Sequence, residues 1–258
     1  MTHQEIAAIL LQAEITQKAC APIRSHLKEL DLESAYKIQK INVDQKIAKG
    51  GIEIGKKIGL TSFKVQEQLG VDQPDFGVLL QHMQFQQGEN LAFAELMQPK
   101  AEAEIAFILK EDLKGKNITT EDVILATDYI TSAIEIVGSR IKDWNIKITD
   151  TIADNASSSH FILGTKKANV QEIDLENNKM QLFVNDQLVS EGDGTSCMGN
   201  PLNSVVWLAN KMNDLGNPLK KGEIILSGAL GPMVNLNPSD KVKASIEGLG
   251  DIDFLVHF

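Results

Sequence analysis

The sequence predicts an α+β protein in which a small helical N-terminal region precedes a larger body with mixed β-sheet. Two observations support this fold class. Apolar residues recur at three- and four-residue spacing in the first fifty positions, which is typical of amphipathic helices. From residue 100 onward, extended apolar stretches alternate with turn residues, as the strands of a sheet do. We place the helical region at residues 1–52 and the body at residues 53–258.

Two helices are expected in the N-terminal region. The first presents an apolar stripe formed by Ile6, Ile9, Leu10 and Ala13. The second begins after Asp31, whose side chain suits an N-cap, and stops at the two glycines of residues 50–51. Glycine and proline residues interrupt residues 53–99, so we expect only short elements there.

The body is expected to contain most of the strands. They are predicted at residues 101–109, 133–137, 161–164, 180–184, 223–227, 241–246 and 252–257. Residues 185–186, Asn-Asp, form a hairpin turn signal after the fourth strand. Two helices accompany the strands, one at residues 120–129 and one that begins after Asn200 and ends at Gly216.

The charge balance excludes several classes of partner. The chain has 25 Lys and Arg residues against 35 Asp and Glu residues, a net charge of −10 and a pI of about 5.0. We therefore expect no binding to nucleic acid or to an anionic membrane surface. No apolar run approaches the ~18–20 residues of a membrane span, and the N-terminus lacks the features of a secretion signal. With two cysteines and no expected disulfide framework, a cytoplasmic location is predicted.

Three glutamates form a candidate metal site. Glu102 and Glu104 are two residues apart in a predicted strand, so their side chains project from the same face. Glu135 stands alone in the apolar stretch 133–137. Carboxylates this close destabilise a fold unless positive charge separates them, and Mg²⁺ or Mn²⁺ prefers such oxygen ligands. The alternative is an exposed strand face on which Glu102 and Glu104 simply meet solvent.

Candidate acid/base residues precede the glutamates. Lys57 lies between Gly55 and Gly59, which would let the backbone approach a ligand closely. Asp75 follows Pro74 in an expected loop. Each has a structural alternative, since Lys57 can be a surface lysine in a turn and Asp75 a turn former.

Residues 154–159 offer amide and hydroxyl groups that could bind an anionic substrate, or they form an ordinary polar loop. Several enzyme signatures are absent from the sequence. These are the glycine-rich dinucleotide and phosphate loops, the nucleophile elbow, and any histidine spacing typical of a metal site.

Longer motifs add a family resemblance. These motifs are residues 55–62 (GKKIGLTS), 65–77 (VQEQLGVDQPDFG), 100–107 (KAEAEIAF), 143–148 (DWNIKI), 150–157 (DTIADNAS) and 207–210 (WLAN). They resemble the 2-keto-4-pentenoate (2-hydroxypenta-2,4-dienoate) hydratases of the fumarylacetoacetate hydrolase superfamily, which act in meta-cleavage degradation of aromatic compounds. The resemblance runs from about residue 31 to the C-terminus. It implies a mixed β-roll core around an acidic metal site and assembly into homo-oligomers.

The resemblance also implies a role for each matching residue. By this resemblance, Glu102, Glu104 and Glu135 are the ligands of Mg²⁺ or Mn²⁺. Acid/base chemistry falls on Lys57 and Asp75, without an assignment of which is acid and which is base. Substrate binding falls on Ser157, in the polar loop, and on Ser227, at the end of a C-terminal strand.

Two alternatives are open within this resemblance. The hydrolase branches carry a lysine where this chain has residues 153–157 (ADNAS), which disfavours C–C bond hydrolysis. The nearest rival is 4-oxalocrotonate decarboxylase, which shares the carboxylates, the lysine and the DNASS run. That branch usually has a hydrophobic-Tyr-Gly sequence at residues 75–77 and lacks the 143–148 motif, so the hydratase is favoured. A non-catalytic subunit that binds the decarboxylase is the other alternative, disfavoured by the intact site residues.

The predicted reaction is therefore addition of water to 2-hydroxypenta-2,4-dienoate, which gives 4-hydroxy-2-oxopentanoate. The expected partners are a small 2-oxo or 2-hydroxydienoic acid, further copies of the chain, and, by resemblance, the decarboxylase.

Overall fold

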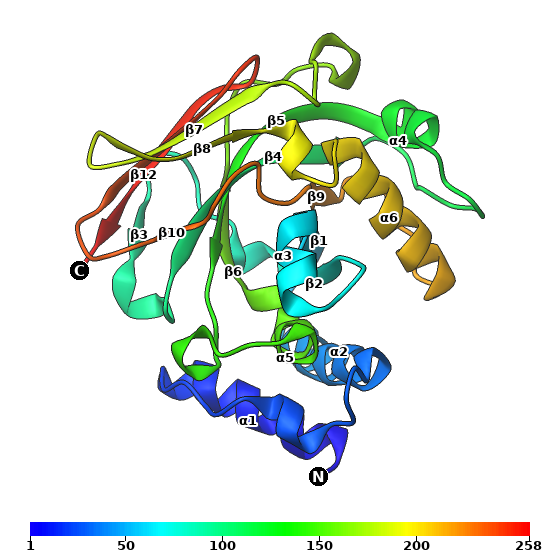
Figure 1. Cartoon of the computed structure of the whole chain (residues 1–258), viewed down its shortest axis with the longest axis vertical. Helices are drawn as coiled ribbons and strands as arrows, with labels where there is room; N and C mark the ends of the chain where they lie inside the picture. Colours follow the sequence, from blue (N-terminus) through cyan, green and yellow to red (C-terminus); the bar gives the residue numbers. More distant parts are fainter.

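The computed structural model describes residues 1–258, apart from the side chain of Leu69. Its elements confirm the α+β prediction, and within the described residues two β-sheets form the body (Figure 1). The helices are α1 (His3–Thr16), α2 (Leu32–Ala48), α3 (Phe63–Leu69), α4 (Thr120–Ala126), α5 (Ile148–Ala153) and α6 (Pro201–Asp214). The strands are β1 (Glu53–Gly59), β2 (Asp75–Leu80), β3 (Asn90–Ala92), β4 (Lys100–Leu109), β5 (Thr127–Val137), β6 (Ser158–Leu163), β7 (Lys179–Val184), β8 (Gln187–Asp193), β9 (Ile224–Leu226), β10 (Val234–Asn235), β11 (Lys241–Ile246) and β12 (Gly250–His257).

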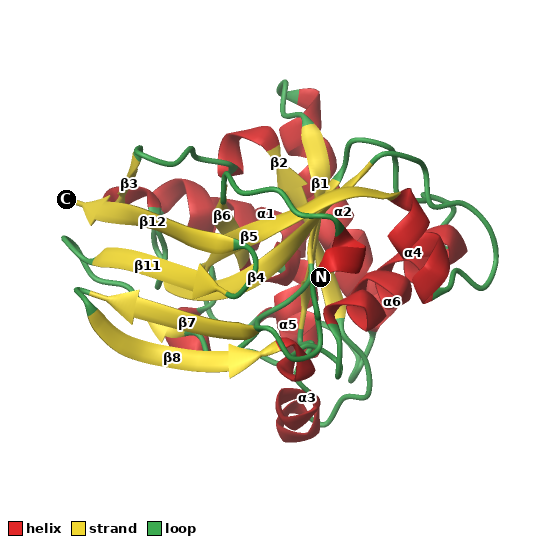
Figure 2. Ribbon diagram, turned by 90° about the horizontal axis from the view of Figure 1, so that it is seen from above, coloured by secondary structure: helices red, strands yellow, loops and turns green.

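The first sheet is mixed and contains seven strands. Its order is β2-β1-β9-β4-β5-β6, with β10 beside the start of β4. The β1–β9 pair is parallel and the other pairs are antiparallel. The second sheet has five strands in the order β3-β12-β11-β7-β8. Figure 2 shows this second sheet as a layer on one side of the molecule, with α4 and α6 on the other side.

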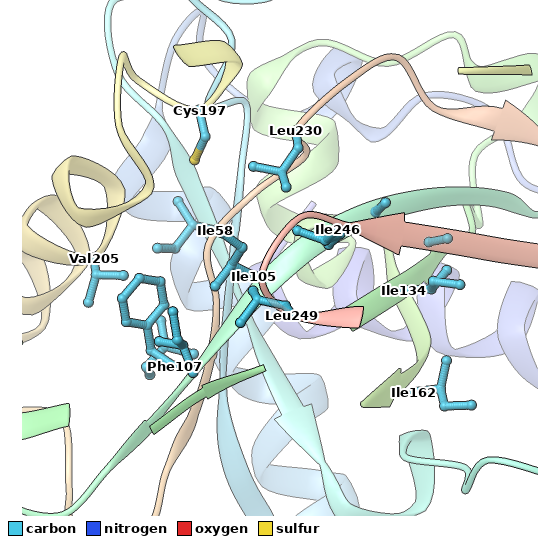
Figure 3. Packing of buried hydrophobic residues seen from close by; sticks show 14 of the residues in the cluster. Ile58, Ile105, Phe107, Ile134, Ile162, Cys197, Val205, Leu230, Ile246 and Leu249 are labelled. Carbon is cyan, nitrogen blue, oxygen red and sulfur yellow. The ribbon is translucent and has the colours of Figure 1, made fainter. Parts of the chain in front are cut away.

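The main core lies between the sheets and α6. In β4 the residues that alternate with the glutamates are apolar and buried, as predicted: Ala103, Ile105 and Phe107. Figure 3 shows Ile105 and Phe107 in one cluster with Val205 of α6, with Ile246 of β11 and with Leu249 of the turn between β11 and β12. Burial of each large apolar side chain of this kind contributes about 1.5–3 kcal/mol to the stability of the fold. The opposite face of β4 is thereby fixed as the face that carries the glutamates.

The N-terminal helices pack on α5 at one end of the molecule (Figure 1). The apolar stripe of α1 is buried, and Ile38 of α2 joins it in a cluster with Ile148 and Ile152 of α5. The predicted cap is confirmed, because the Asp31 side chain accepts a hydrogen bond of 3.0 Å from Ser34 N. The N-terminal region is thus joined to the body through α5.

Several other predictions are confirmed. The strands predicted from residues 101, 180, 241 and 252 correspond to β4, β7, β11 and β12. Both residues of the predicted turn, Asn185 and Asp186, have left-handed φ angles of 52° and 62° and join β7 to β8. Helix α6 begins after Asn200, whose side chain accepts a hydrogen bond from Leu202 N.

Two expectations need correction. The helix predicted at residues 120–129 ends at Ala126, because residues 127–129 pair with the end of β4 as the start of β5. Residues 53–99 contain only short elements, as expected, but residues 53–59 and 75–80 form an antiparallel strand pair. Asp75 consequently lies at the start of β2 and not in a loop. Among the described residues, no helix has the length and apolar character needed to cross a membrane.

Candidate metal and catalytic site

The three predicted glutamates converge. Glu102 of β4 stands directly opposite Glu135 of β5, and Glu104 is the next residue on that face of β4. One carboxylate oxygen of each lies within 4.8 Å of the others. Glu104 and Glu135 are both 0% exposed, and Glu102 is half-buried. The alternative of an exposed strand face is therefore wrong for Glu104.

These carboxylates have more oxygen atoms than protein donors. Gly228 N donates a hydrogen bond of 2.8 Å to Glu104 Oε2. Glu104 Oε1 and Glu135 Oε1 accept no hydrogen bond from any described residue, and Glu135 Oε2 has only the Lys57 ammonium group near it, at 3.2 Å. Burial, and then the repulsion from Glu135 and Glu102, raises the pKa of Glu104 well above its usual value. Burial likewise raises the pKa of Glu135 to about 7. Buried, unpartnered oxygens at this spacing fit the ligand set of a hard divalent cation, so these residues can hold a metal.

Lys57 places a positively charged side chain beside the glutamates. Its side chain on β1 is 3% exposed, and its Nζ lies 3.2 Å from Glu135 Oε2 and donates a hydrogen bond of 2.9 Å to Ala156 O. Burial alone would lower the pKa of Lys57, but Glu135, then Glu102, offsets this effect and the pKa is raised. The ammonium form is thus favoured. The alternative of a surface lysine in a turn is wrong.

Asp75 lies beside Lys57 on the neighbouring strand. Thr151 of α5 donates a hydrogen bond of 3.2 Å to Asp75 Oδ2, whereas Asp75 Oδ1 is buried and accepts none from the described part of the chain. Burial raises the pKa of Asp75. Gly59 provides the space: a Cβ there would lie 2.2 Å from Asp75 Oδ1 and 3.6 Å from Lys57 Nζ. Because Gly59 has no side chain, Asp75 Oδ1 and Lys57 Nζ can both lie beside it.

The polar loop supplies the carbonyl group that binds Lys57. Residues 155–157 form a short turn, η5 (Asn155–Ser157), with successive left-handed φ angles of 54°, 50° and 56°. Such angles cost non-glycine residues about 1–3 kcal/mol each, so the turn needs anchors. The Asn155 side chain provides one, because it accepts a bond of 2.8 Å from Val78 N and donates one of 2.9 Å to Val78 O. Arg140 provides another through its ion pair with Asp154.

The two predicted substrate-binding serines lie at the edges of this arrangement. Ser157 is buried, with its hydroxyl 3.4 Å from Thr151 Oγ1. The Ser227 hydroxyl accepts a bond of 3.3 Å from Ile105 N, and the residue after it, Gly228, is the one that donates to Glu104. The structure therefore brings both serines close to the site, and substrate binding by either one stays a prediction.

Sequence reasoning missed several contributors. Thr151 lies within a family motif that gives it no role of its own, and Gly228 acts through its backbone N–H, which no residue type reveals. Asn155 belongs to the loop expected to bind substrate, but its amide pairs with β2. Only a prediction that β2 is a strand next to this loop could have found the contacts of Thr151 and Asn155.

A mixed-sheet fold with buried carboxylates, a buried lysine and a buried aspartate defines an enzyme site of the acid/base type. The chain belongs to the fumarylacetoacetate hydrolase family, because its residues 56–257 match the model described as "Fumarylacetoacetate (FAA) hydrolase C-terminal".

Three relatives are informative. The chain is 47% identical to 2-keto-4-pentenoate hydratase 1 of Dechloromonas aromatica (strain RCB) over 255 residues, which cover 99% of this chain and 97% of the relative. It is 48% identical to the 2-keto-4-pentenoate hydratase of Paraburkholderia xenovorans (strain LB400), with coverage of 97% and 93%. The solved 4-oxalocrotonate decarboxylase from Pseudomonas putida G7, complexed with magnesium and adipate, superposes with a TM-score of 0.93 at 30% identity and 98% coverage of both chains.

Proposed function

We propose that this protein is a hydratase that adds water to 2-hydroxypenta-2,4-dienoate and forms 4-hydroxy-2-oxopentanoate in the meta-cleavage degradation of aromatic compounds. The observation that carries the proposal is the identity of 47–48% over nearly the whole chain to two proteins named 2-keto-4-pentenoate hydratase. The identity to the decarboxylase is lower, at 30%. The complete set of acidic and basic site residues supports an active enzyme.

The proposed cofactor is Mg²⁺ or Mn²⁺, held by Glu102, Glu104 and Glu135. The unpartnered oxygens of this cluster, and the magnesium complex of the decarboxylase relative, support this choice. When bound, the ion supplies positive charge that stabilises negative charge on the 2-oxygen of a 2-oxo acid.

The proton transfers are assigned to the two buried residues beside the cluster. Asp75 Oδ1 is a free acceptor with a raised pKa, so it takes the proton of the enol hydroxyl group. Lys57 carries its proton at Nζ and donates it to C5, which yields the conjugated ketone with its double bond between C3 and C4. Water then adds at C4, the proton that leaves the water goes to Lys57, and the proton on Asp75 goes to C3. Both residues return to their starting states, and the net change is addition of one water molecule.

The decarboxylase alternative differs at the far end of the substrate. A decarboxylase of this type accepts a second carboxylate, whereas the hydratase accepts a short neutral vinyl group and a water molecule. The lower identity to the decarboxylase, 30% against 47–48% to the two hydratases, favours the neutral group. A non-catalytic partner subunit would have no need of a buried lysine beside two buried glutamates and a half-buried one, because buried charges are costly to the fold.

The test compares both reactions on one preparation. We expect rapid loss of the dienoate ultraviolet absorbance with Mg²⁺ or Mn²⁺, formation of 4-hydroxy-2-oxopentanoate, and little carbon dioxide from 4-oxalocrotonate. Faster carbon dioxide release than dienoate hydration would replace the hydratase by the decarboxylase. Turnover of neither compound by the metal-loaded protein would favour the partner subunit.

The assembly and location predictions belong to the same proposal. We expect a homo-oligomer, able to associate with a 4-oxalocrotonate decarboxylase, in the cytoplasm. Light scattering on the purified protein, alone and with the decarboxylase, measures both associations.

A further inference from the structure

Gln39 of α2 is a buried amide between two parts of the candidate site. Its side chain lies on the buried face of the helix with Ala35, Ile38 and Val43, and the residue is 4% exposed. Its Nε2 donates two hydrogen bonds, one of 2.8 Å to Phe76 O in β2 and one of 3.0 Å to Ile152 O in α5. Both amide protons are therefore used, and they join a strand and a helix that are far apart in the sequence.

The position of β2 explains why these contacts are needed. β2 is the edge strand of the first sheet, so only one side of its backbone pairs with β1. In an antiparallel pair, alternate residues direct their N–H and C=O groups outward. Phe76 O and the N–H and C=O of Val78 are such groups, and they are bound by the side-chain amides of Gln39 and Asn155. Two amides thus take the place of a further strand.

The two carbonyl groups that Gln39 binds lie next to the catalytic contact. Phe76 follows Asp75, and Ile152 follows Thr151. Thr151 Oγ1 and Asp75 Oδ2 are themselves 3.2 Å apart, which is near the upper limit of a hydrogen bond. A small shift of β2 relative to α5 would break this contact and turn the Asp75 carboxyl group.

We propose that Gln39 is a positioning residue for the reaction: by clamping β2 to α5 it holds the Asp75 carboxyl group against Thr151 and keeps Oδ1 in the space beside Gly59 that Lys57 Nζ also borders. This inference rests on the proposed function for its effect on rate. It gives the N-terminal helical region a part in catalysis, although that region contributes no residue to the carboxylate cluster.

The residue type suits the role. The two carbonyl oxygens need two donors from one short group, and a neutral amide provides them without placing a charge in an apolar layer. Lysine or arginine would add a buried charge near Asp75, and a hydroxyl group has a single proton.

The test pairs Gln39→Met with a matched control. Methionine has nearly the same length as glutamine and no donor. Asn42→Leu is the control, because Asn42 lies on the same helix and donates a bond of 3.0 Å to Ala7 O in α1, away from Asp75. We expect Gln39→Met to lower kcat by about 10-fold or more, with the KM for the dienoate and the affinity for Mg²⁺ unchanged. We expect Asn42→Leu to leave kcat within about twofold.

A second arm separates positioning from a general loss of stability. In an Asp75→Asn background the proposed route is already lost, so Gln39→Met should lower kcat by less than about twofold more. A purely structural defect would lower kcat by the same factor in both backgrounds, and that result would overturn the proposal.

Hydrogen–deuterium exchange makes the test independent of turnover. Gln39→Met should speed amide exchange in peptides from β2 and α5, and Asn42→Leu should not. Wild-type protein that fails to hydrate the dienoate would contradict the proposed function, while the exchange arm would still decide the clamp. An active Gln39→Met enzyme with wild-type kcat and unchanged exchange would contradict the clamp alone.

Discussion

Lys56 and Lys57 are neighbours in the sequence and are both buried, yet the strand turns them to opposite faces of the sheet. Lys56 forms an ion pair with Glu53 and lies 3.8 Å from Glu223, whereas Lys57 lies 3.2 Å from Glu135. Both lysines are buried and have carboxylate partners. They differ because only Lys57 lies beside Asp75 and the glutamate cluster, where the proposed reaction takes place.

This difference gives the first prediction. Lys57→Met should lower kcat by about 10²-fold or more, because it removes a proton donor and acceptor, and it should leave Mg²⁺ bound. Steady-state kinetics and titration calorimetry measure the two effects. Lys56→Met is the matched control: it should destabilise the fold by breaking a buried pair and leave kcat within about threefold. If Lys57→Met raised only KM, Lys57 would be a binding group for the substrate carboxylate.

A second prediction concerns Glu104. Glu104→Gln keeps the size of the side chain, retains an oxygen for the Gly228 N–H, and removes one negative charge. We expect loss of most Mg²⁺ affinity and of most activity, together with an unchanged fold by circular dichroism. Full activity in the chelator-treated Glu104→Gln protein would refute the metal site.

The charged residues of the site were predictable, whereas their supports were not. A pair of glutamates two residues apart must share one strand face, and the family motifs then select Lys57, Asp75 and Glu135. No spacing rule shows that Gly228 N meets Glu104, because this contact joins segments more than a hundred residues apart. Similarly, the 3.2 Å contact between Thr151 and Asp75 depends on the packing of α5 against β2.

At the scale of elements, η5 has three residues with left-handed φ angles, and the Asn155 side chain is one of its two anchors. The Asn155 amide pairs with the N–H and C=O of Val78, and the turn directs Ala156 O at Lys57. The chain contains the same pairing elsewhere. Asn210 of α6 accepts a bond of 2.8 Å from Ile118 N and donates one of 2.9 Å to Ile118 O.

These two asparagines form a matched pair for the third prediction. Asn155→Ala and Asn210→Ala should each lower the free energy of unfolding by about 1–3 kcal/mol, since each leaves backbone groups without partners. Urea unfolding measures this loss. Only Asn155→Ala should also lower kcat, because only its turn binds Lys57. Equal kcat values for the two variants would show that the turn is a purely structural device.

The elements themselves were predicted unevenly. Helices α2 and α6 have capping residues and a regular apolar stripe, so local sequence defines them. β1 and β2 have no such alternation, because β1 carries lysines toward both faces and glycines at its close contacts. Tertiary pairing also extends β5 back to Thr127 against the helical pattern before it. Local signals fail where pairing with a distant strand decides the structure.

At the scale of the whole molecule, the acidic site opposes folding unless a cation is present. The net charge of −10 adds to this effect. The glutamate cluster lies in the centre of the first sheet, where β4 and β5 pair over most of their length. A cation that reduces the repulsion among these glutamates would therefore stabilise the central sheet, and not a peripheral loop.

The fourth prediction follows from this arrangement. Under the proposed function Mg²⁺ binds only the folded chain, so a concentration of 100 times its Kd should stabilise the fold by about 2.7 kcal/mol. For a chain of this size, that corresponds to a rise in Tm of about 5–10 °C.

The pH dependence of this stabilisation has a definite sign. The pKa of Glu135 is raised from 4.5 to about 7 in the folded chain, so its protonated form contributes stability that is lost as the pH rises through about 7. Mg²⁺ needs the ionised carboxylates, so the rise in Tm on adding Mg²⁺ should grow between pH 5 and pH 8. Thermal melts with Mg²⁺ or chelator across this range measure the effect. Glu104→Gln should abolish it, and Glu33→Gln, a change at an exposed residue of α2, should preserve it. A rise in Tm that is equal in Glu104→Gln, or that shrinks as the pH increases, would show that Mg²⁺ acts elsewhere on the protein.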